Sequence, residues 1–478
     1  MRVTIGVDVG TTVTKAVGFT PDGRAVAVAS RPTVLRRLPG GRYEQNPDQV
    51  AASVGEVLAE LAARCPHPVT GIGVTGQGDG LWLVDRDARA VRPAVSWLDG
   101  RAVGILAEWS ADGRTAEVFR RTGNHLFPGA SGPLLAWMDT HEPAALAGAA
   151  TAGYCKDVVV QRLTGLRATE VSDASAPFLD PHTRRYDESL IDACGLGRHR
   201  DLLAPVLATP VGELTATAVP DGPPAGTPVV AAPYDLPATA IGAGVTGVGD
   251  GVLIVGTTLA CQVVTDRVRT DGPPAGLTLS LPDPGRWLRA MPAMVGSAAL
   301  DWVLTLVGAT VDDLPALLAA SPPGANGVRM LPFLAEAGER APFTAPHARG
   351  SFDGLRLGTA RADLVRAACE AIAYSARHCL TAAGLTGRLS ACGGGIASAE
   401  WRQIFADVLG RPIHAHTGEQ VGARGAARTV HAALDLPPLP GPPAAVVTPD
   451  PAAVADYEAG YADYLRRLER ARTGWTGP

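Results

Sequence analysis

Two short runs of small and hydroxyl-bearing residues could hold phosphate. Residues 7–12 read Val-Asp-Val-Gly-Thr-Thr, and residues 254–258 read Ile-Val-Gly-Thr-Thr. In each run an apolar strand enters a tight turn and a second apolar strand follows, so backbone amides and hydroxyls could meet phosphate oxygens. The residues that we expect to bind the β- and γ-phosphates of a nucleotide are Gly10, Thr11, Thr12, Gly256, Thr257 and Thr258. Two such turns with acids beside them indicate ATP-dependent phosphotransfer.

Two carboxylates fit that chemistry. A hydroxyl that attacks the γ-phosphorus needs a carboxylate within hydrogen-bond reach to accept its proton. Asp235 is the candidate base, because it lies between an apolar run and a small-residue stretch, a setting that suits a strand end or a helix start. The alternative for such an Asp is a helix cap. Asp8 ends the first strand, where it could hold Mg²⁺ through water or instead accept turn amides.

Lysine is rare in this chain. Of the 42 basic residues, all but Lys15 and Lys156 are arginine. Arginine replaces lysine on a solvated surface at little cost, so a compact ammonium kept in place points to function, with composition bias as the alternative. Lys15 follows the first turn closely, and we expect it to contact the phosphates.

The elements that position these residues occur twice. The first half predicts strands at 3–9, 13–19 and 24–30, a helix from Pro47 to about Cys65 capped by Asn46, and strands near 70–75 and 81–85. The second half opens in the same way, with strands near 251–256, 259–265, 277–281 and 286–290. This repetition indicates a duplicated α/β unit with a mixed sheet.

The second half ends in alternating helices and strands. We predict a helix at 362–383, a strand at 388–392, a helix from about Ser398, a strand at 412–415, a helix at 422–434, a Pro-rich linker at 437–451 and a last helix at 452–472. Gly393, Gly394 and Gly395, at a strand-to-helix junction, would let adenosine lie against bare backbone, with Ser398 as the cap of the next helix.

Several other classes of protein are disfavoured. Residues 242–247 match GxGxxG, but they follow a helical stretch and precede a strand, the reverse of the Rossmann order, and the chain has no P-loop motif. A net charge of -5 without basic runs argues against nucleic-acid and membrane partners. The seven scattered cysteines, without a Cys-x-x-Cys pair, predict reduced and mostly buried thiols in a cytoplasmic protein.

Longer stretches resemble the FGGY carbohydrate kinase family. Besides the two turns, they are Pro233 to Ala240, Gly393 to Gln403 with 406–408, Ala348 to Phe352 and Gly422 to Ala427. The resemblance spans the chain to about residue 436. It implies two actin-like (ribonuclease-H-like) α/β domains with mixed sheets and a deep cleft between them, a sugar or polyol in the cleft, and Mg-ATP across the C-terminal half.

The resemblance also implies a division of the chain. A substrate-binding domain would occupy residues 1–243, a nucleotide-binding domain 244–436, and a linker with a C-terminal helix packed on the second domain 437–478. By the habit of the family we also expect a homodimer.

In this family the residues after Gln77, and Trp97, line the sugar pocket. The substrate-binding set implied is Gln77, Gly78, Asp79, Trp97 and Asp235. Asp79 could accept bonds from two hydroxyls, and Trp97 could cover the apolar face of the carbon chain. Glycerol kinases have Arg-Glu after the Gln and many xylulokinases Met-His, whereas the stretch here looks most like polyol kinases of the erythritol type.

Two further features lie near this pocket. Tyr234 stands where family members often have a small residue or His. Asp99 and Arg101 could touch the substrate or form an ion pair that only shapes their loop.

The sequence therefore predicts an ATP-dependent kinase that phosphorylates a terminal hydroxyl of a small polyol of four or five carbons. A ketopentose such as xylulose is the alternative acceptor. A ligand-sensing pseudokinase is a further alternative, against which the intact Asp8 and Asp235 argue. A chaperone would need a separate peptide-binding domain, and an iron-sulfur activator would need clustered cysteines.

Overall fold

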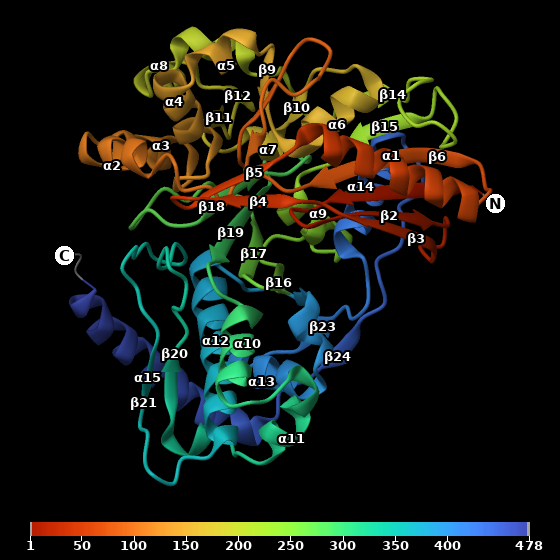
Figure 1. Cartoon of the computed structure of the whole chain (residues 1–478). Coiled ribbons are helices and arrows are strands. Elements are labelled where there is room, and N and C mark those ends of the chain that lie inside the picture. The colour runs from red at the N-terminus through yellow and green to blue at the C-terminus, as the bar shows by residue number, and fades with distance from the viewer. Residues whose placement is uncertain (1, 476–478) are drawn as a thin grey trace. The chain divides into compact units, whose positions relative to one another are not determined.

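The chain divides by its contacts into two compact units. The structure is a computed structural model that describes residues 2–475. The first unit comprises the chain up to Gly244, Asp266–Leu288 and Gln420–Pro442, and the second comprises Val245–Thr265, Arg289–Glu419 and the chain from Pro443. Figure 1 labels most of their elements and colours the chain from the N-terminus to the C-terminus.

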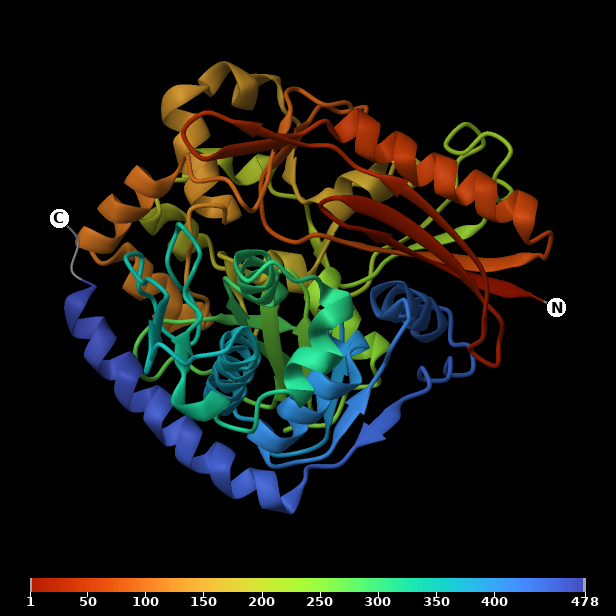
Figure 2. The same ribbon diagram turned by 60° about the horizontal axis from the view of Figure 1, so that its bottom comes forward.

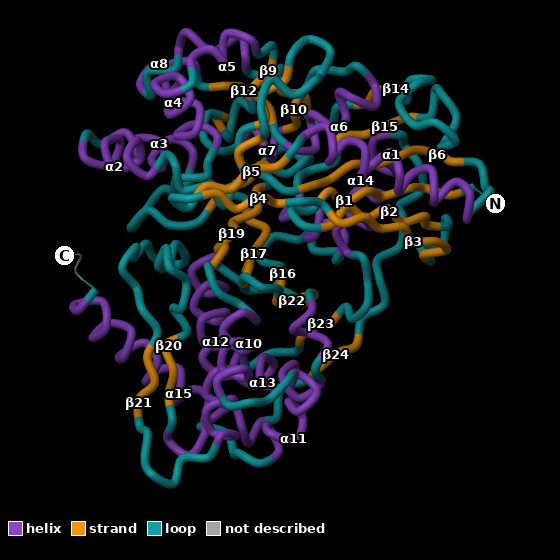
Figure 3. The backbone as a smooth tube through the Cα atoms, in the orientation of Figure 1, coloured by secondary structure: helices purple, strands orange, loops and turns teal. Residues whose placement is uncertain are grey.

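A six-stranded mixed sheet forms the centre of the first unit. Its order is β14 (Val211–Glu213), β15 (Pro228–Ala231), β6 (Val69–Gly76), β1 (Val3–Val9), β2 (Val13–Phe19) and β3 (Ala25–Pro32). Strand β1 pairs with β2 antiparallel and with β6 parallel. Figure 3 draws the strands of this sheet, like all other strands, in orange.

Side-chain alternation along β1 gives the sheet two different faces. Val3, Ile5, Val7 and Val9 join the core that α1 (Pro47–Arg64) and α6 (Cys155–Thr164) complete. Asn46 caps α1 by accepting the N–H groups of residues 48 and 49, and Pro47 is its first residue, which confirms the predicted start. The even-numbered residues of β1, among them Asp8, belong to the other face.

Bare backbone lets α14 (Val421–Ala433) pack closely on that other face, beside α9 (Asp235–Gly242). A Cβ added to Gly6 of β1 would lie 2.7 Å from the carbonyl carbon of Ala423. A Cβ added to Gly73 of β6 would lie 2.6 Å from the carbonyl carbon of Ala426. Neither position has room for a side chain, so these glycines set how closely α14 approaches the sheet.

Smaller elements extend the first unit around a core of their own that includes Leu81, Trp109, Leu134 and Ile191. The strands are β4 (Leu35–Leu38), β5 (Arg42–Gln45), β7 (Trp82–Val84), β8 (Ala94–Val95), β9 (Thr151–Gly153), β10 (Thr169–Glu170), β11 (Leu179–Asp180), β12 (Arg185–Tyr186), β13 (Val206–Leu207) and β18 (Leu277–Ser280). The helices are α2 (Val103–Ala111), α3 (Arg114–Thr122), α4 (Ser131–His141), α5 (Pro143–Gly148), α7 (Val171–Ala174), α8 (Glu188–Ala193) and the 3-10 helix Gly197–Leu202.

The second unit repeats the strand order of the first. Six strands of its seven-stranded sheet run in the order β24 (Ala445–Val447), β23 (Ile413–Ala415), β22 (Leu389–Cys392), β16 (Gly251–Val255), β17 (Leu259–Thr265) and β19 (Trp287–Ala293). Strand β16 pairs with β17 antiparallel and with β22 parallel, just as β1 pairs with β2 and β6. The edge strand β24 is antiparallel to β23, as β14 is to β15. This order confirms the predicted duplication.

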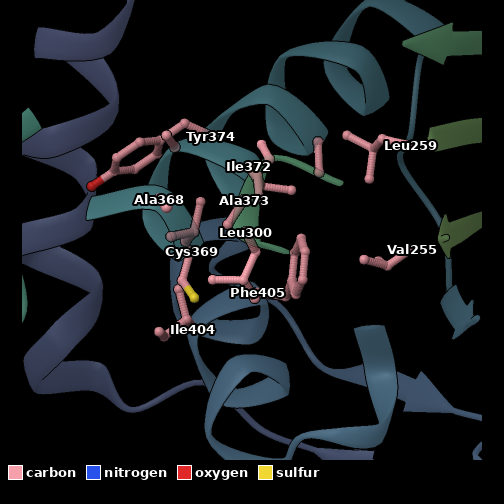
Figure 4. Close-up of a cluster of buried hydrophobic side chains, with 14 of the residues drawn as sticks. Val255, Leu259, Leu300, Ala368, Cys369, Ile372, Ala373, Tyr374, Ile404 and Phe405 are labelled. Carbon is pink, nitrogen blue, oxygen red and sulfur yellow. The ribbon is translucent and has the colours of Figure 1, made fainter. Parts of the chain in front are cut away.

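Helices complete the second unit around an apolar core. They are α10 (Ser297–Leu306), α11 (Leu314–Ala319), α12 (Arg361–Ala383), α13 (Ala399–Leu409) and α15 (Pro451–Gly474), with the 3-10 helices 311–313, 325–327 and 394–397 and the hairpin of β20 (Arg329–Leu331) and β21 (Ser351–Asp353). Figure 4 shows Leu259, Leu300, Ile372 and Phe405 within this core. The C-terminal helix α15 lies along the outside of the unit (Figure 2) and adds Tyr457, Tyr464 and Leu468 to the core.

Two features of the fold differ from what the sequence predicts. The Pro-rich stretch 437–451 contains strand β24, which pairs with β23 at the edge of a sheet, where local proline does not prevent pairing. The contact-based units also place residues 420–442 and 266–288 with the first unit, whereas the predicted domains 1–243, 244–436 and 437–478 follow the chain. That domain division stays a prediction.

Residues 242–247 begin at the last residue of helix α9 and precede strand β16, which confirms that they lack the Rossmann order. All seven cysteines, each within the described part of the chain, are buried free thiols, as the sequence predicts. Over residues 2–475, no single helix combines the length and apolar composition of a membrane span. One bent pair of helices, Ser297–Leu306 with Val311–Ala319, has the length and composition of such a span, and nothing else supports that role.

Candidate active site

The turn between β1 and β2 brings an acid and a lysine together. Asp8 stands opposite Lys15 in the antiparallel pair, and the Lys15 ammonium donates to Gln420 Oε1 at 3.3 Å. Burial raises the pKa of Asp8, and the positive charge of Lys15 opposes that rise. The Gly10 N–H donates to the Val13 carbonyl at 3.1 Å and closes the turn.

The surroundings of Asp8 fit a magnesium ion bound largely through water. A Cβ added to Gly422, near the start of α14, would lie 2.5 Å from Asp8 Oδ2, so the absence of a side chain leaves this carboxylate uncrowded. Mg²⁺ prefers oxygen ligands, retains several waters, and is usually held by one or two carboxylates together with substrate phosphates. Within residues 2–475 no cluster of three or more His, Cys, Asp or Glu side chains could hold a metal by itself. The role of Asp8 in holding magnesium stays a prediction.

Thr11 lies among the residues expected to bind the acceptor. Its hydroxyl donates to Gln77 Oε1 at 3.1 Å and accepts from Trp97 Nε1 at 3.1 Å. The buried Gln77 in turn donates to Gln45 Oε1 at 2.7 Å, and Gln45 donates to the Thr11 carbonyl at 2.8 Å. Thr12, in contrast, is exposed. The phosphate-binding roles of both threonines stay predictions, and Gln45 was not predicted at all.

Asp235 is the first residue of α9, and two other carboxylates influence it. Burial and the negative charge of Asp8 raise its pKa to about 8, the N–H of Leu236 opposes this rise, and the charge of Asp79 adds to it. The structure therefore brings together the predicted base, the predicted metal-binding acid and the predicted acceptor-binding acid within the first unit. A carboxyl with this pKa binds a proton from an alcohol more strongly than an ordinary Asp does.

The segment after β6 has an unusual backbone. Asp79 has φ of 56°, in the left-handed region that side chains other than those of Asn and Asp rarely adopt, and Gly80 has φ of 74°. The ring of Tyr234 covers Gly78, since an added Cβ there would lie 2.6 Å from Cε2 and 2.9 Å from Cγ of that ring. Burial and the charges of Asp79 and Asp235 raise the pKa of Tyr234 well above its usual value.

Asp99 and Arg101 form the ion pair that the sequence left as one of two alternatives. Arg101 Nε donates to Asp99 Oδ1 at 2.8 Å, and Arg101 Nη2 donates to Glu44 Oε1 at 2.7 Å. The N–H of Tyr43 donates to Asp99 Oδ2 at 2.6 Å. Both partners of the pair are buried, so their contacts fix the loop that carries Trp97.

Lys156, which the sequence marked only by the rarity of lysine, lies in a buried cluster of acids. Its fully buried Nζ is 2.6 Å from Asp157 Oδ1, 2.8 Å from Asp173 Oδ2 and 3.6 Å from Glu170 Oε1. Glu170 also accepts the N–H of Ser172 at 2.7 Å at the start of α7. The cluster therefore ties α6 to α7.

This cluster continues to the residue before the candidate base. The Ser172 hydroxyl donates to Glu170 and accepts the N–H of Tyr234 at 3.1 Å. Burial raises the pKa of both Glu170 and Asp173, while the Lys156 charge opposes the rise. No sequence pattern pointed to Ser172, because Tyr234, whose N–H it accepts, lies 62 positions away along the chain.

The second Gly-Thr-Thr turn joins β16 and β17 in the second unit. The Gly256 carbonyl accepts the N–H of Ser297 at 2.7 Å, and the Thr257 carbonyl accepts that of Gly296 at 2.9 Å. The start of α10 thereby holds the turn, with Thr257 exposed and Thr258 half-buried.

The three glycines after β22 also belong to the second unit. Gly393 has φ of 100°, and a Cβ there would lie 2.8 Å from the Val255 carbonyl carbon. No atom would lie within 4 Å of a Cβ added to Gly394, whereas one on Gly395 would lie 2.9 Å from the Trp401 ring. Ser398 Oγ accepts the Trp401 N–H at 3.2 Å, which confirms Ser398 as the cap of α13. The phosphate and adenosine roles of these two segments stay predictions.

Both halves of the chain match known family models. Residues 3–242 match the model described as the N-terminal domain of the FGGY family of carbohydrate kinases, and residues 251–434 match its C-terminal domain. An erythritol kinase of Brucella abortus is 33% identical over 464 residues, which cover 91% of this chain and 88% of that protein. A xylulose kinase of Escherichia coli is 30% identical over 458 residues, or 91% of this chain and 93% of that protein.

Solved structures share the fold. The crystal structure of a xylulose kinase from Rhodospirillum rubrum aligns with a TM-score of 0.89 at 30% identity and covers 99% of this chain and 100% of that one. A gluconate kinase from Lactobacillus acidophilus aligns with a TM-score of 0.92 at 23% identity, with 99% of both chains covered. These alignments confirm the predicted α/β class with two actin-like domains and mixed sheets.

Proposed function

Because this chain belongs to the FGGY family of carbohydrate kinases, and is thus a phosphotransferase with an alcohol group as acceptor, we propose that it transfers the γ-phosphate of Mg-ATP to a terminal hydroxyl of a small polyol. The acceptor has four or five carbons and resembles erythritol. The observation that carries this proposal is Asp235, which begins α9 with its pKa raised to about 8 beside the charges of Asp8 and Asp79.

Each residue near Asp235 then has a defined task. Asp235 in its ionised form accepts the proton of the attacking hydroxyl. Asp79 accepts hydrogen bonds from neighbouring hydroxyls of the acceptor, and Trp97 covers its carbon chain. The bond from Trp97 Nε1 to Thr11 fixes the indole, so that its ring is already oriented before the acceptor arrives.

Other predicted residues bind the nucleotide in this proposal. The Gly-Thr-Thr residues of both turns and Lys15 contact the phosphates, and Gly393 to Gly395 lie against the adenosine. Asp8 holds Mg²⁺ through water; when bound, this ion neutralises charge on the phosphates, which is a large part of catalysis in phosphoryl transfer. Residues 1–243 would bind the acceptor, and residues 244–436 the nucleotide.

The setting of the reaction is part of the proposal. We place the enzyme in the cytoplasm, where ATP is available and its seven free thiols would stay reduced. Its partners are then small molecules, and we propose a homodimer from the habit of the family.

A ketopentose of the xylulose type is the second candidate acceptor. It is favoured by the 30% identity to the Escherichia coli xylulose kinase over most of both chains. The two candidates differ at one carbon, where a ketose has a carbonyl that only accepts hydrogen bonds and a polyol has a hydroxyl that also donates. Asp79 is an acceptor-only group when ionised, which suits the polyol.

A coupled assay of ADP release tests the function directly. The purified protein is assayed with Mg-ATP against polyols of three to six carbons and against ketopentoses. We expect strong turnover on one short polyol and a loss on the order of a hundredfold or more in Asp235→Asn, as is typical for removal of a general base. Asp87→Asn, at an exposed position, is the matched control and keeps full turnover. Turnover of no member of the panel, or full activity of Asp235→Asn, would refute the proposal.

A further inference from the structure

Gly78 is a glycine because a side chain at this position has no room, and not because its φ requires a glycine. Unlike Asp79 and Gly80, it has no positive φ, so its φ does not call for glycine. A Cβ at this position would lie 2.6 Å from Cε2 and 2.9 Å from Cγ of Tyr234, closer than real Cβ atoms approach such atoms. The ring of Tyr234 therefore fills the space that a side chain at position 78 would need.

Tyr234 is held firmly in that position. Its side chain is buried, with 4% of the residue exposed, and its N–H donates to Ser172 Oγ at 3.1 Å. Ser172 is itself bonded to Glu170 of the Lys156 cluster. The backbone bond to Ser172 and the burial of the side chain therefore keep the ring packed against Gly78.

The same ring lies among the acids that act on the acceptor. Tyr234 directly precedes Asp235, and the charges of Asp79 and Asp235, together with burial, raise the pKa of its phenol. The phenol consequently stays neutral across the physiological range and adds no charge to a group of carboxylates. A neutral ring packed against Gly78, with Asp79 and Asp235 as the chain neighbours of Gly78 and of Tyr234, is suited to limit what can bind beside them.

We propose that Tyr234 is a specificity-determining residue, whose ring interlocks with Gly78 and closes the acceptor site beside Asp79 and Asp235, so that only short acyclic polyols fit. This inference rests on the proposed function, because it concerns the length of the same acceptor. The ring is larger than one CHOH unit, so its removal would leave room for at least one further carbon of the acceptor. Exclusion of one such unit is worth about 10- to 200-fold in kcat/KM.

The first test compares acceptors of different length in three variants. We would measure kcat/KM by ADP release with four-, five- and six-carbon polyols for the wild type, Tyr234→Ala and Tyr234→Phe. We expect the ratio of six- to four-carbon acceptors to rise about tenfold or more in Tyr234→Ala and to stay unchanged in Tyr234→Phe, which keeps the ring. Tyr464→Ala truncates an equally buried Tyr of the second unit, and we expect it to lower the unfolding temperature without changing this ratio.

The second test addresses the interlock without relying on turnover. Gly78→Ala is made in the wild type and in Tyr234→Ala, and thermal unfolding is measured for all four proteins. We expect Gly78→Ala to lower the unfolding temperature when the ring is present, and to have little effect on it when the ring is absent. Tyr234→Leu replaces Tyr234→Ala in both tests if the alanine variant does not fold.

The outcomes separate this inference from the proposed function. A folded Tyr234→Ala or Tyr234→Leu enzyme with the acceptor ratio of the wild type would show that the ring only fills the core. Equal effects of Gly78→Ala in both backgrounds would overturn the interlock. A wild-type protein without activity on any member of the panel would instead overturn the proposed function, and the length limit with it.

Discussion

The protonation of Asp235 determines how the proposed activity depends on pH. Because burial and the charge of Asp8 raise its pKa to about 8, most of this carboxyl is protonated at neutral pH. We expect kcat/KM for the acceptor to rise about tenfold per pH unit below that pKa and to level off above it. A pH profile of ADP release measures this, and an acidic limb near pH 4 would contradict it. Asp79→Asn removes a negative charge that raises the pKa of Asp235, so the acidic limb of the pH profile of this variant should move to lower pH.

The same carboxyl links pH to stability. Its pKa is about 8 in the folded chain, whereas an unfolded Asp has a pKa of about 3.9. Between these values the folded chain binds a proton that the unfolded chain releases, so the free energy of unfolding falls as pH rises through this window. In Asp235→Asn this contribution is absent. Urea unfolding of both proteins at pH 5 and pH 8 measures it, and parallel changes in the two proteins would count against the assignment.

The two threonines of the first turn should have separable effects. The Thr11 hydroxyl bonds to Gln77 and Trp97, whereas Thr12 is exposed. We expect Thr11→Val to raise the KM for the acceptor several-fold, since each lost hydrogen bond is worth about 1 kcal/mol. Thr12→Val is the matched variant and should raise only the KM for ATP, whereas Thr11→Val should affect the KM for both substrates, because Thr11 also contacts phosphate in the proposed function. Initial rates with each substrate varied in turn would show the contrast, and a Thr11→Val enzyme impaired only toward ATP would contradict it.

At the level of elements, the buried Lys156 joins α6 to α7 and, through Ser172, to the start of α9. Lys156→Met would leave Asp157, Asp173 and Glu170 without their buried cation, and we expect a loss of about 3–5 kcal/mol in the free energy of unfolding. Lys156→Arg should not rescue it, because the larger guanidinium has no room at a fully buried position. Chemical unfolding of the two variants and the wild type measures these changes in the free energy of unfolding.

The only other lysine provides the comparison. Lys15 is half-buried and bonds to Gln420, so Lys15→Met should change stability far less than Lys156→Met does. Similar unfolding curves for these two variants would mean that the cluster adds little to stability.

Elements with local signals could be predicted from the sequence. The pattern of apolar residues predicted β1 and β2, and the Asn46 cap with Pro47 predicted the start of α1. Strand β24 was missed because the prolines around it mask a pairing with β23 that only the folded chain creates. A local pattern does not contain such long-range pairing.

The same limit applies to the site. Asp8, Asp235 and the glycine turns have residue types and neighbours that point to their chemistry. Gln45 was missed because it contacts Gln77 across 32 positions, and Ser172 because it contacts Tyr234 across 62. Such contacts leave no periodic trace, so nothing in the sequence distinguished these polar residues from others. Lys156 had a signal of another kind, the rarity of lysine, but rarity indicated neither its partners nor its burial.

At the level of the whole chain, the first unit combines a duplicated sheet with a segment from near the C-terminal end of the chain. Two sheets share one strand order, yet the first unit is completed only when the chain returns to it with α14 near the C-terminal end. This helix packs against α9, whose first residue is Asp235. A segment far from the candidate base in sequence therefore supports it in space.

The packing of α14 against α9 predicts that a substitution at one glycine of α14 affects the candidate base. A Cβ at Gly425 of α14 would lie 2.6 Å from the carbonyl carbon of Ala238 in α9. We expect Gly425→Leu to push α9 away and to cost about 1–3 kcal/mol of stability or more through overpacking, with a matching loss of turnover as Asp235 is displaced. Ala432→Leu adds the same bulk at an exposed position of the same helix and should leave both unchanged. Unfolding and ADP release measured on both variants decide this: a Gly425→Leu enzyme as stable and active as Ala432→Leu would mean that α14 does not hold the candidate base in place.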